Sequence, residues 1–468
     1  MRVRLIIGWL LVLSLVAAIG YAQTPAAVPS SRPAAQAPAA QAPTRSLSLA
    51  EALDIARRNN PEYRTVLNDR TPASRNLLGA TTSLFTPSVD VNGGYFWTDA
   101  GRQYFQGVGF DGASRSQTST SLRLNYSLSG ASFANRGLAA AELRAVDQDI
   151  AGSQTVLETR IRTQYLNVLE AQAQAGVARR SVERTSEQLN LAQARHSVGQ
   201  GTLIDVRRAQ VAKGNSEVAR LRANQNAENQ TLVLFNAMGV PAPTVPNVAL
   251  TDSFPVLPPP WSLDSLLEFS VAQNPALLSL RAREASARWG TRSARSEYLP
   301  SLNLSAGTGH TTSRTGSFLA PDTAGNIITV PAQTDRTKTP WNINLGISLP
   351  IFDGFTRYAR TATARAREED AQHLVRAREL QVRSDVVSAF NSLQAAYIAI
   401  GIQQDNRIAA TEALELGTQR YRVGSGSYLE LLDARFSADE ADRDYVTAVY
   451  AYHRAIATLE QAVGRPLR

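Results

Sequence analysis

The stretch VGQGTLID at residues 198–205 has a second version, VGSGSYLE, at residues 423–430. In both, a glycine follows a valine and can adopt the left-handed conformation that ends a helix. A hydroxyl residue and an acid then follow at the spacing of a capping box, which starts another helix. Each stretch therefore predicts a tight turn between two helices, and a plain helical hairpin is its simplest interpretation.

Long segments without proline precede both turns. They run from Gly137 to about Ser197 and from Phe355 to about Arg422. At 1.5 Å per residue, helices of this length would be roughly 90 to 100 Å long, several times the diameter of a small domain. A stripe of apolar residues at heptad spacing in each segment predicts coiled-coil packing, which suits the wall of a tunnel or a solid bundle. The stripe residues are Ile161, Tyr165, Val168, Val386, Phe390, Leu393, Tyr397 and Ile400.

The two turns belong to an internal repeat of about 215 to 225 residues. Asn60-Pro61 returns as Asn274-Pro275, and Gly239 returns as Gly464. Each half has the same predicted order of elements: a short helix, a strand, a polar loop, a strand, a very long helix, a tight turn and a second long helix.

Composition divides the chain into five segments. Residues 1–22 place two arginines before an apolar run and end in small residues, which is the pattern of a secretory signal peptide. A Pro/Ala-rich extended lead-in follows at 23–46, and the first structural repeat occupies 47–240. A Pro-rich connector at 241–260 cannot continue a helix, and it leads to the second structural repeat at 261–468.

Each half contains two segments in which apolar and polar residues alternate. The segments run from Val89 to Trp97, from Leu122 to Leu128, from Leu302 to Ala306 and from Ile343 to Leu349. Two-faced strands of about ten residues are typical of a transmembrane barrel wall, although a soluble sheet packed on one side has the same pattern. Aromatic residues near the strand ends favour the membrane, as do the long polar loops expected at 98–118 and 308–340.

Four such strands are too few to close a barrel. The smallest barrels of this type have about eight strands, and an open sheet edge in lipid is prohibitive. We therefore expect several copies of the chain to share one barrel surrounded by outer-membrane lipid.

Composition also argues against enzymatic and nucleic-acid functions. The chain has no cysteine and four histidines, none of them paired at the spacing of a helical metal site, so we expect no metal and no cofactor. The formal charge of +8 comes from arginines that alternate with acids in the helical stretches, so we expect no nucleic-acid partner. No nucleophile, base and orienting group cluster in the sequence, and no catalytic residue is assigned.

The signal peptide, the duplicated halves, the paired strands and the turn pattern together resemble the TolC-type outer-membrane factors, from about Leu47 to Arg468. The resemblance implies an α+β membrane protein with a duplicated β-α repeat. In this family a homotrimer closes a 12-stranded β-barrel, which a long periplasmic α-helical barrel continues. It implies a location in the outer membrane of a Gram-negative-type cell, with a large periplasmic portion.

The function that the resemblance implies is passive conduction and not catalysis. The chain would be the exit duct of a tripartite efflux pump or a type I secretion system. An inner-membrane efflux or secretion transporter would deliver substrates through a periplasmic adaptor, also called a membrane fusion protein.

The resemblance also implies roles for residues near the turns. Glu430 and Asp433 would form acidic rings at a periplasmic gate, while Asp205 and Tyr421 would link the two hairpins in the closed state. Another interpretation of Glu430 is that it only caps its helix. Gly426 departs from the family pattern, because some members have an arginine there that locks neighbouring protomers, and Arg208 is the candidate substitute.

The hairpin tips would contact the adaptor in this family. The tip residues at these positions are Val198, Gly199, Gly201, Thr202, Leu203, Val423, Gly424, Gly426, Ser427 and Leu429.

Two other classes of protein are alternatives. A periplasmic coiled-coil scaffold or adaptor without a membrane barrel would have a β-rich flanking module and no two-faced strands. A secreted hydrolase on a helical stalk would need a catalytic cluster.

Overall fold

The computed structural model describes residues 45–105, 108–242, 248–321 and 327–467. Residues 46–468 form one compact unit, to which the following description applies. The predicted signal peptide and nearly all of the predicted lead-in lie outside the described residues.

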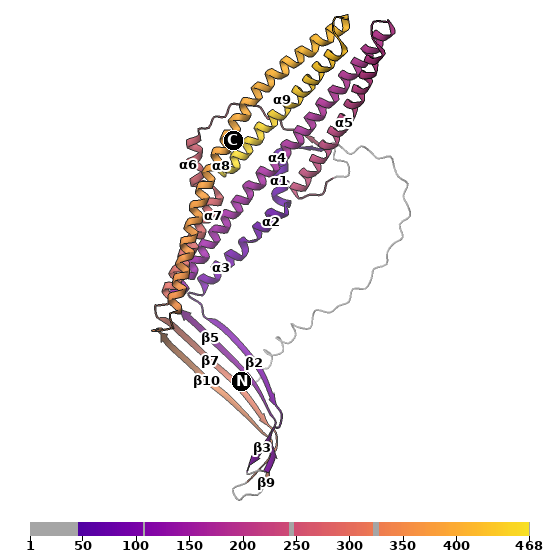
Figure 1. Ribbon diagram of the computed structural model, residues 1–468. Helices are drawn as coiled ribbons and strands as arrows, with labels where there is room; N and C mark the ends of the chain where they lie inside the picture. The colour runs from indigo at the N-terminus through magenta and orange to yellow at the C-terminus, as the bar shows by residue number, and fades with distance from the viewer. Residues whose placement is uncertain (1–44, 106–107, 243–247, 322–326, 468) are drawn as a thin grey trace, which may run out of the picture. The chain divides into compact units, whose positions relative to one another are not determined.

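Four long strands form one antiparallel sheet in the order β10-β7-β5-β2 (Figure 1). They are β2 (Ser88–Thr98), β5 (Arg115–Leu128), β7 (Ser301–Thr315) and β10 (Gln333–Ser348). The four predicted strands are thereby confirmed, although Leu349 lies one residue beyond β10. Strands β2 and β10 form the two edges of this sheet.

The pairing register gives the sheet one apolar face. Val91 pairs with Leu122, and Leu124 pairs with Ala306. Residues on the other face include Asp90, which pairs with Arg123. Because side chains alternate between the two faces of a strand, the predicted two-faced pattern holds across all four strands.

The strands extend further than predicted. They contain 11, 14, 15 and 16 residues, so β5, β7 and β10 reach into the segments predicted as loops. Those segments also contain two short hairpins, β3 (Arg102–Phe105) with β4 (Val108–Asp111) and β8 (Phe318–Pro321) with β9 (Ile327–Val330). Threonine and serine favour extended backbone but are polar on both faces, which hides these strand ends from a test of hydrophobic alternation.

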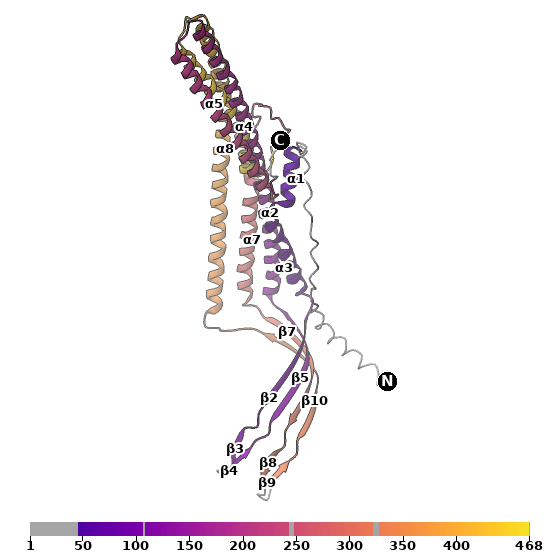
Figure 2. The ribbon, with the colours of Figure 1, turned by 90° about the vertical axis from the view of Figure 1, so that its right-hand side faces the viewer.

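Two helical hairpins make up most of the unit. Helix α4 (Gly130–Ser197) pairs with α5 (Leu203–Met238), and α8 (Thr356–Val423) pairs with α9 (Tyr428–Val463). Helices α4 and α8 have 68 residues each, which corresponds to about 100 Å. The two predicted hairpins are confirmed, and contacts between α4 and α9 hold them together. Their turns lie at the end of the helices opposite the sheet (Figures 1 and 2).

The prediction of one short helix at the start of each half is wrong. The first half has three helices, α1 (Leu49–Asn59), α2 (Pro61–Asn68) and α3 (Arg70–Thr82), and the second has two, α6 (Leu263–Gln273) and α7 (Pro275–Ser296). Helices α1 and α2 are separated at Asn60-Pro61, and α6 and α7 at Asn274-Pro275, because proline is tolerated only in the first turn of a new helix. Helices α2 and α3 are separated at Asp69.

Each of these asparagines also ties its helices to the end of a hairpin. The Asn60 side chain accepts a hydrogen bond from the Tyr63 amide (2.9 Å) and donates one to the Ala237 carbonyl (2.8 Å). Asn274 makes the equivalent bonds to Leu277 (3.2 Å) and Ala462 (3.0 Å). The repeated Asn-Pro pair therefore marks a structural joint in each half.

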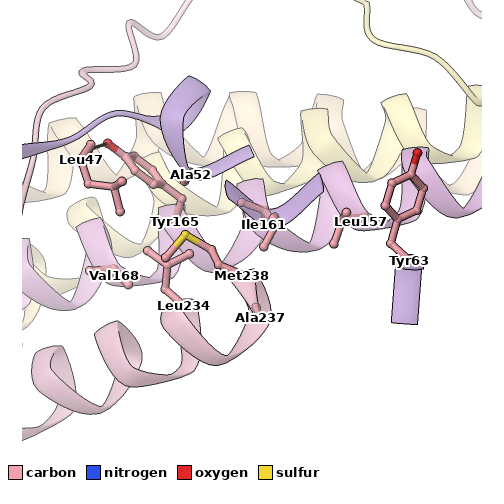
Figure 3. Packing of buried hydrophobic residues seen from close by; sticks show 11 residues of the cluster. Leu47, Ala52, Tyr63, Leu157, Ile161, Tyr165, Val168, Leu234, Ala237 and Met238 are labelled. Atoms are coloured by element: carbon pink, nitrogen blue, oxygen red, sulfur yellow. Dashed lines mark hydrogen bonds between the residues drawn. The ribbon is translucent and has the colours of Figure 1, made fainter. Parts of the chain in front are cut away.

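Two related apolar cores lie beside these joints. In the first core, Tyr165 and Ile161 of α4 face Leu234 and Met238 of α5 (Figure 3). The Tyr165 hydroxyl lies 2.9 Å from the Leu47 carbonyl of β1 (Arg45–Leu47) and 2.8 Å from the Asp252 carboxylate. Strand β1 pairs with β6 (Val248–Leu250).

The second core is built from α6, α8 and α9. Val386, Phe390, Leu393 and Ile400 of α8 belong to it, so these stripe residues pack as predicted. Helix α8 also contains an 18-residue window of mean hydropathy 1.2, which by length and composition alone could cross a membrane. Of that window, 28% is buried within the unit, and one such helix is weak evidence for a membrane span.

Candidate functional site at the hairpin tips

The first hairpin turn forms as its sequence predicts. Gly199 has a φ of 75°, in the left-handed region, and its amide donates to the His196 carbonyl (3.0 Å). The capping box is complete, because the Asp205 amide donates to Thr202 Oγ1 (3.3 Å) and the Thr202 amide donates to Asp205 Oδ2 (3.4 Å). Thr202 and Asp205 therefore satisfy each other's backbone amides, and Thr202 is the N-cap residue at which α5 begins.

The second turn forms only half of its predicted capping box. Gly424 has a φ of 82°, and the Glu430 amide donates to Ser427 Oγ (3.2 Å). Within the described residues, the Glu430 carboxylate does not return a bond to Ser427 and lies 3.6 Å from Arg420 Nη1. The arginine on the preceding helix therefore competes with the cap for this carboxylate, and Glu430 does not act as the second half of a capping box.

Arg195 of α4 connects the first hairpin to the second. Its Nη2 donates to the Gln200 carbonyl (2.9 Å) within its own turn, and its Nη1 donates to the carbonyl of Tyr421 on α8. Its guanidinium carbon also lies 4.6 Å from the centre of the Tyr421 ring, which is a cation–π distance. Arg195 was not identified from the sequence, although it and Arg420 occupy equivalent positions in the repeat.

Tyr421 and Asp205 are close in space but are not hydrogen-bonded to each other. Tyr421 is buried, its ring centre lies 5.5 Å from that of Tyr428, and its hydroxyl has no hydrogen-bond partner in the described chain. Burial raises the pKa of Tyr421, and the nearby Asp205 carboxylate raises that pKa further. The structure therefore places the predicted pair near each other, and at the tips Arg195 contacts Tyr421 directly across the two hairpins.

The remaining predicted gate residues are exposed. Asp433 and Arg208 are both solvent-exposed, and no ion pair within the described part of the chain involves either one. Gly426 is confined, because a Cβ there would lie 3.0 Å from Arg420 Cβ and 3.3 Å from Glu430 Oε2. Arg420 thus occupies the space that a side chain at position 426 would enter.

Apolar side chains at both tips are exposed to solvent. All ten residues predicted for adaptor contact lie in or beside the two turns. The exposed apolar members are Val198 (67%), Leu203 (53%), Val423 (76%) and Leu429 (61%). Exposed apolar side chains grouped at one end of a unit are suited to binding another protein.

A partly buried ionic network joins the hairpins below the tips. Arg184 of α4 donates to Asp439 Oδ1 (2.8 Å) and Asp442 Oδ2 (3.1 Å) of α9. Arg407 of α8 donates to the other oxygen of Asp442 (2.8 Å). Burial acts to raise the pKa of Asp442, but the bonds from Arg407 and Arg184 outweigh it and hold that pKa below its usual value. Sequence analysis missed this network, since it depends on which helix faces meet.

Arg435 lies beside the network and is 2% exposed. Burial lowers its pKa, an effect that the nearby Asp439 partly offsets. In the described residues, no group of three or more histidine, aspartate or glutamate side chains is arranged to hold a metal ion. The tip region therefore offers helix contacts, exposed carboxylates and apolar contact residues.

Solved outer-membrane channels share this fold of a four-stranded sheet continued by two long helical hairpins. The outer membrane protein VceC of Vibrio cholerae has a TM-score of 0.69 against this chain at 19% identity, covering 90% of this chain and 97% of VceC. A model of the outer membrane efflux protein family matches residues 52–240 and 266–465. The chain belongs to the outer membrane efflux protein family.

Two curated relatives agree with this assignment. The outer membrane protein TolC of Escherichia coli is 27% identical over 426 residues, which cover 90% of this chain and 83% of TolC. The alkaline protease secretion protein AprF of Pseudomonas aeruginosa is 23% identical over 423 residues, which cover 89% of this chain and 84% of AprF. The protein is an outer-membrane exit duct of an efflux or secretion system, with a large periplasmic portion. Its family is one of channels and not of enzymes.

Proposed function

We propose that three copies of the chain close one 12-stranded barrel in the outer membrane, continued in the periplasm by a barrel of long helices. Each copy contributes two structural repeats, residues 47–240 and 261–468, joined by the connector at 241–260. Substrates pass through passively, and no bond is made or broken, so the protein is not an enzyme.

The open edges of the sheet are the observation that supports this proposal most strongly. Strands β2 and β10 are unpaired on their outer sides within the described chain. Apolar side chains on these edges are largely exposed, including Val91 (78%), Ile343 (73%) and Ile347 (75%). Lipid tolerates apolar side chains but not unpaired backbone groups, so β2 of one copy pairs with β10 of the next.

The hairpin tips form the periplasmic entrance in this proposal. Glu430 and Asp433 supply acidic rings, one carboxylate of each from every copy. In the closed state, Arg195 holds Tyr421 and Asp205 close together across the two hairpins. Arg208, which is exposed and without an ion pair in the described chain, is available to a neighbouring copy.

The partners follow from the exposed tips. A periplasmic adaptor binds the apolar tip residues, and an inner-membrane transporter loads substrate through it. Separation of the two hairpins then opens the entrance, which requires the Arg195 contact with Tyr421 to break.

Channel formation is tested by planar-bilayer recording of the purified full-length protein. We expect discrete conductance steps from a protein that migrates as a trimer on unheated denaturing gels and as a monomer after boiling. A scaffold or adaptor without a barrel would instead give a water-soluble protein and no conductance. That result would contradict the proposed assembly.

A further inference from the structure

Cationic side chains lie on the apolar face of the sheet, at the end remote from the helices. The pairing register aligns Thr120, His310 and Lys338 in one row across β5, β7 and β10. The next row contains Thr118, Thr312 and Arg336, and the row after it contains Ser116 and Arg314. Lys338, Arg336 and Arg314 form what we term the cationic collar, His310 lies beside Lys338 in the same row, and all four side chains are exposed.

The collar is on the same face as the lipid-facing side chains. On β7, His310 and Arg314 are an even number of residues from Leu304, and alternate residues of a strand share a face. On β10, Lys338 pairs with His310 just as Ile343 pairs with Ala306, and paired residues share a face. Aromatic side chains accompany the collar on β2, where Tyr95 pairs with Thr118 and Trp97 pairs with Ser116.

The charge on this face is one-sided. Among the residues of these four strands, the face with the collar has no aspartate or glutamate, whereas the opposite face has Asp90 and Asp335 beside Arg115 and Arg123. The opposite face therefore balances its own charges. The collar needs an anion from outside the described chain.

The height of the collar matches the far boundary of the apolar band. Ile347 pairs with Leu302 and Arg336 pairs with Thr312, so the two β10 residues are ten residues of strand β7 apart. The bulge between Thr339 and Asn342 adds one extra residue to β10. At about 3.3 Å per residue and a strand tilt of about 40°, this separation is about 25 Å, the usual height of an outward-facing apolar band. Because the helices are periplasmic, the collar is at the level of the outer leaflet.

A hollow lies where the apolar band meets the collar. It has a volume of about 350 Å³, and its lining includes Val91 and Leu122 on the apolar side and Lys338 with the polar His310 on the side of the collar. Small side chains such as Thr120 and Thr308 leave this space open. The hollow thus combines a surface for an acyl chain with a cation for a headgroup phosphate.

We propose that the cationic collar and its hollow bind a phosphorylated, acylated glycolipid of the outer leaflet, such as lipid A. Arginine and lysine form charge-assisted hydrogen bonds with phosphate, and long cationic side chains at a membrane boundary extend toward the headgroups. The acyl chains continue along the apolar band. This inference rests on the proposed barrel, because the barrel turns the collar face toward lipid.

Native mass spectrometry of the full-length protein in detergent tests the proposal with three lipids: diphosphorylated lipid A, dephosphorylated lipid A and phosphatidylglycerol. We expect diphosphorylated lipid A to bind at least tenfold more tightly than either other lipid. The variant Arg336→Gln/Lys338→Gln should weaken this binding at least tenfold, since each cation near an anionic surface contributes substantially to binding. The matched control Arg115→Gln/Arg123→Gln removes two cations from the opposite face and should bind like the wild type.

Several results would overturn the proposal. One is equal binding of phosphorylated and dephosphorylated lipid A by the wild type, and another is equal loss in the two double variants. Phosphatidylglycerol binding as tightly as lipid A would make the site a general anionic-lipid surface and would also contradict it. The charge-preserving variant Arg336→Lys/Lys338→Arg should retain binding, so loss there would also count against the proposal. Bilayer conductance is recorded for the same samples, because a wild type without conductance contradicts the barrel and not the lipid site.

Discussion

Gly239→Ala is expected to prevent folding of the first repeat and hence assembly of the channel. Gly239 has a φ of 75°, which costs an alanine about 1–2 kcal/mol. An added Cβ would also lie 2.5 Å from the Asn59 carbonyl oxygen and 2.8 Å from Asn60 Cα, both backbone atoms that cannot turn aside. A total loss of about 4 kcal/mol or more is expected, which is exceptional for a single substitution.

The measurement is the yield of heat-modifiable trimer from the outer-membrane fraction, with the thermal midpoint by circular dichroism for any protein recovered. Gly199→Ala is the matched control, because Gly199 has the same φ of 75° but no atom within 4 Å of the added Cβ. Gly199→Ala should lose only the stability that the left-handed backbone conformation costs an alanine. Gly464→Ala should behave like Gly239→Ala, since its Cβ would lie 2.6 Å from Pro275 Cδ. Wild-type yield from Gly239→Ala would show that the joint at Asn60 is not tightly packed.

Glu430→Ala/Asp433→Ala is expected to weaken block of the channel by multivalent cations at least tenfold. In a trimer, the double substitution removes six carboxylates from the proposed entrance. Both side chains are exposed, so the fold should persist, and Ser427 still caps α9. The expected change is at least a tenfold rise in the cation concentration that halves the conductance, measured in planar bilayers at fixed ionic strength, because screening weakens such effects.

The two acids should not contribute equally. Glu430 has Arg420 as a partner at 3.6 Å, whereas Asp433 has no ion-pair partner in the described chain, so Asp433→Ala alone should have the larger effect. The control Glu440→Ala/Asp444→Ala removes two exposed acids further along α9 and should leave the block nearly intact. Unchanged block in Glu430→Ala/Asp433→Ala would show that the acidic rings are elsewhere.

The sequence contained most of the fold because its signals were local. Heptad spacing located α4 and α8, and the glycines at 199 and 424 located both turns to the residue. Strand positions followed from alternation only where one face was apolar. Around Thr118 and Thr312, both faces are polar, so the strand extensions became visible only through backbone pairing.

The site was less predictable because its contacts depend on how helices from different halves meet. The position of Arg195 against Tyr421 requires knowing which faces of α4 and α8 are adjacent. The only feature of the sequence that pointed to Arg195 was its position in the repeat, which is equivalent to that of Arg420. The incomplete capping box at Ser427 was missed for the same reason, because residue spacing alone does not show that Arg420 competes for the Glu430 carboxylate.

Shared closure of the barrel is the central claim, and cysteine pairing across the strand edges tests it most directly. The natural chain has no cysteine, so introduced pairs are unambiguous. Asn92→Cys on β2 is combined in turn with Thr337→Cys, Thr339→Cys or Asn344→Cys on β10. Within one copy these strands are separated by two others, a span of about 14 Å that a disulfide cannot bridge.

The account predicts that at least one pair oxidises to a covalent trimer that survives boiling in denaturant and dissociates on reduction. Each single-cysteine variant should remain a monomer after boiling. If all three pairs remain monomeric under oxidation, or if they link only two copies, then neighbouring chains do not complete a three-copy barrel through β2 and β10.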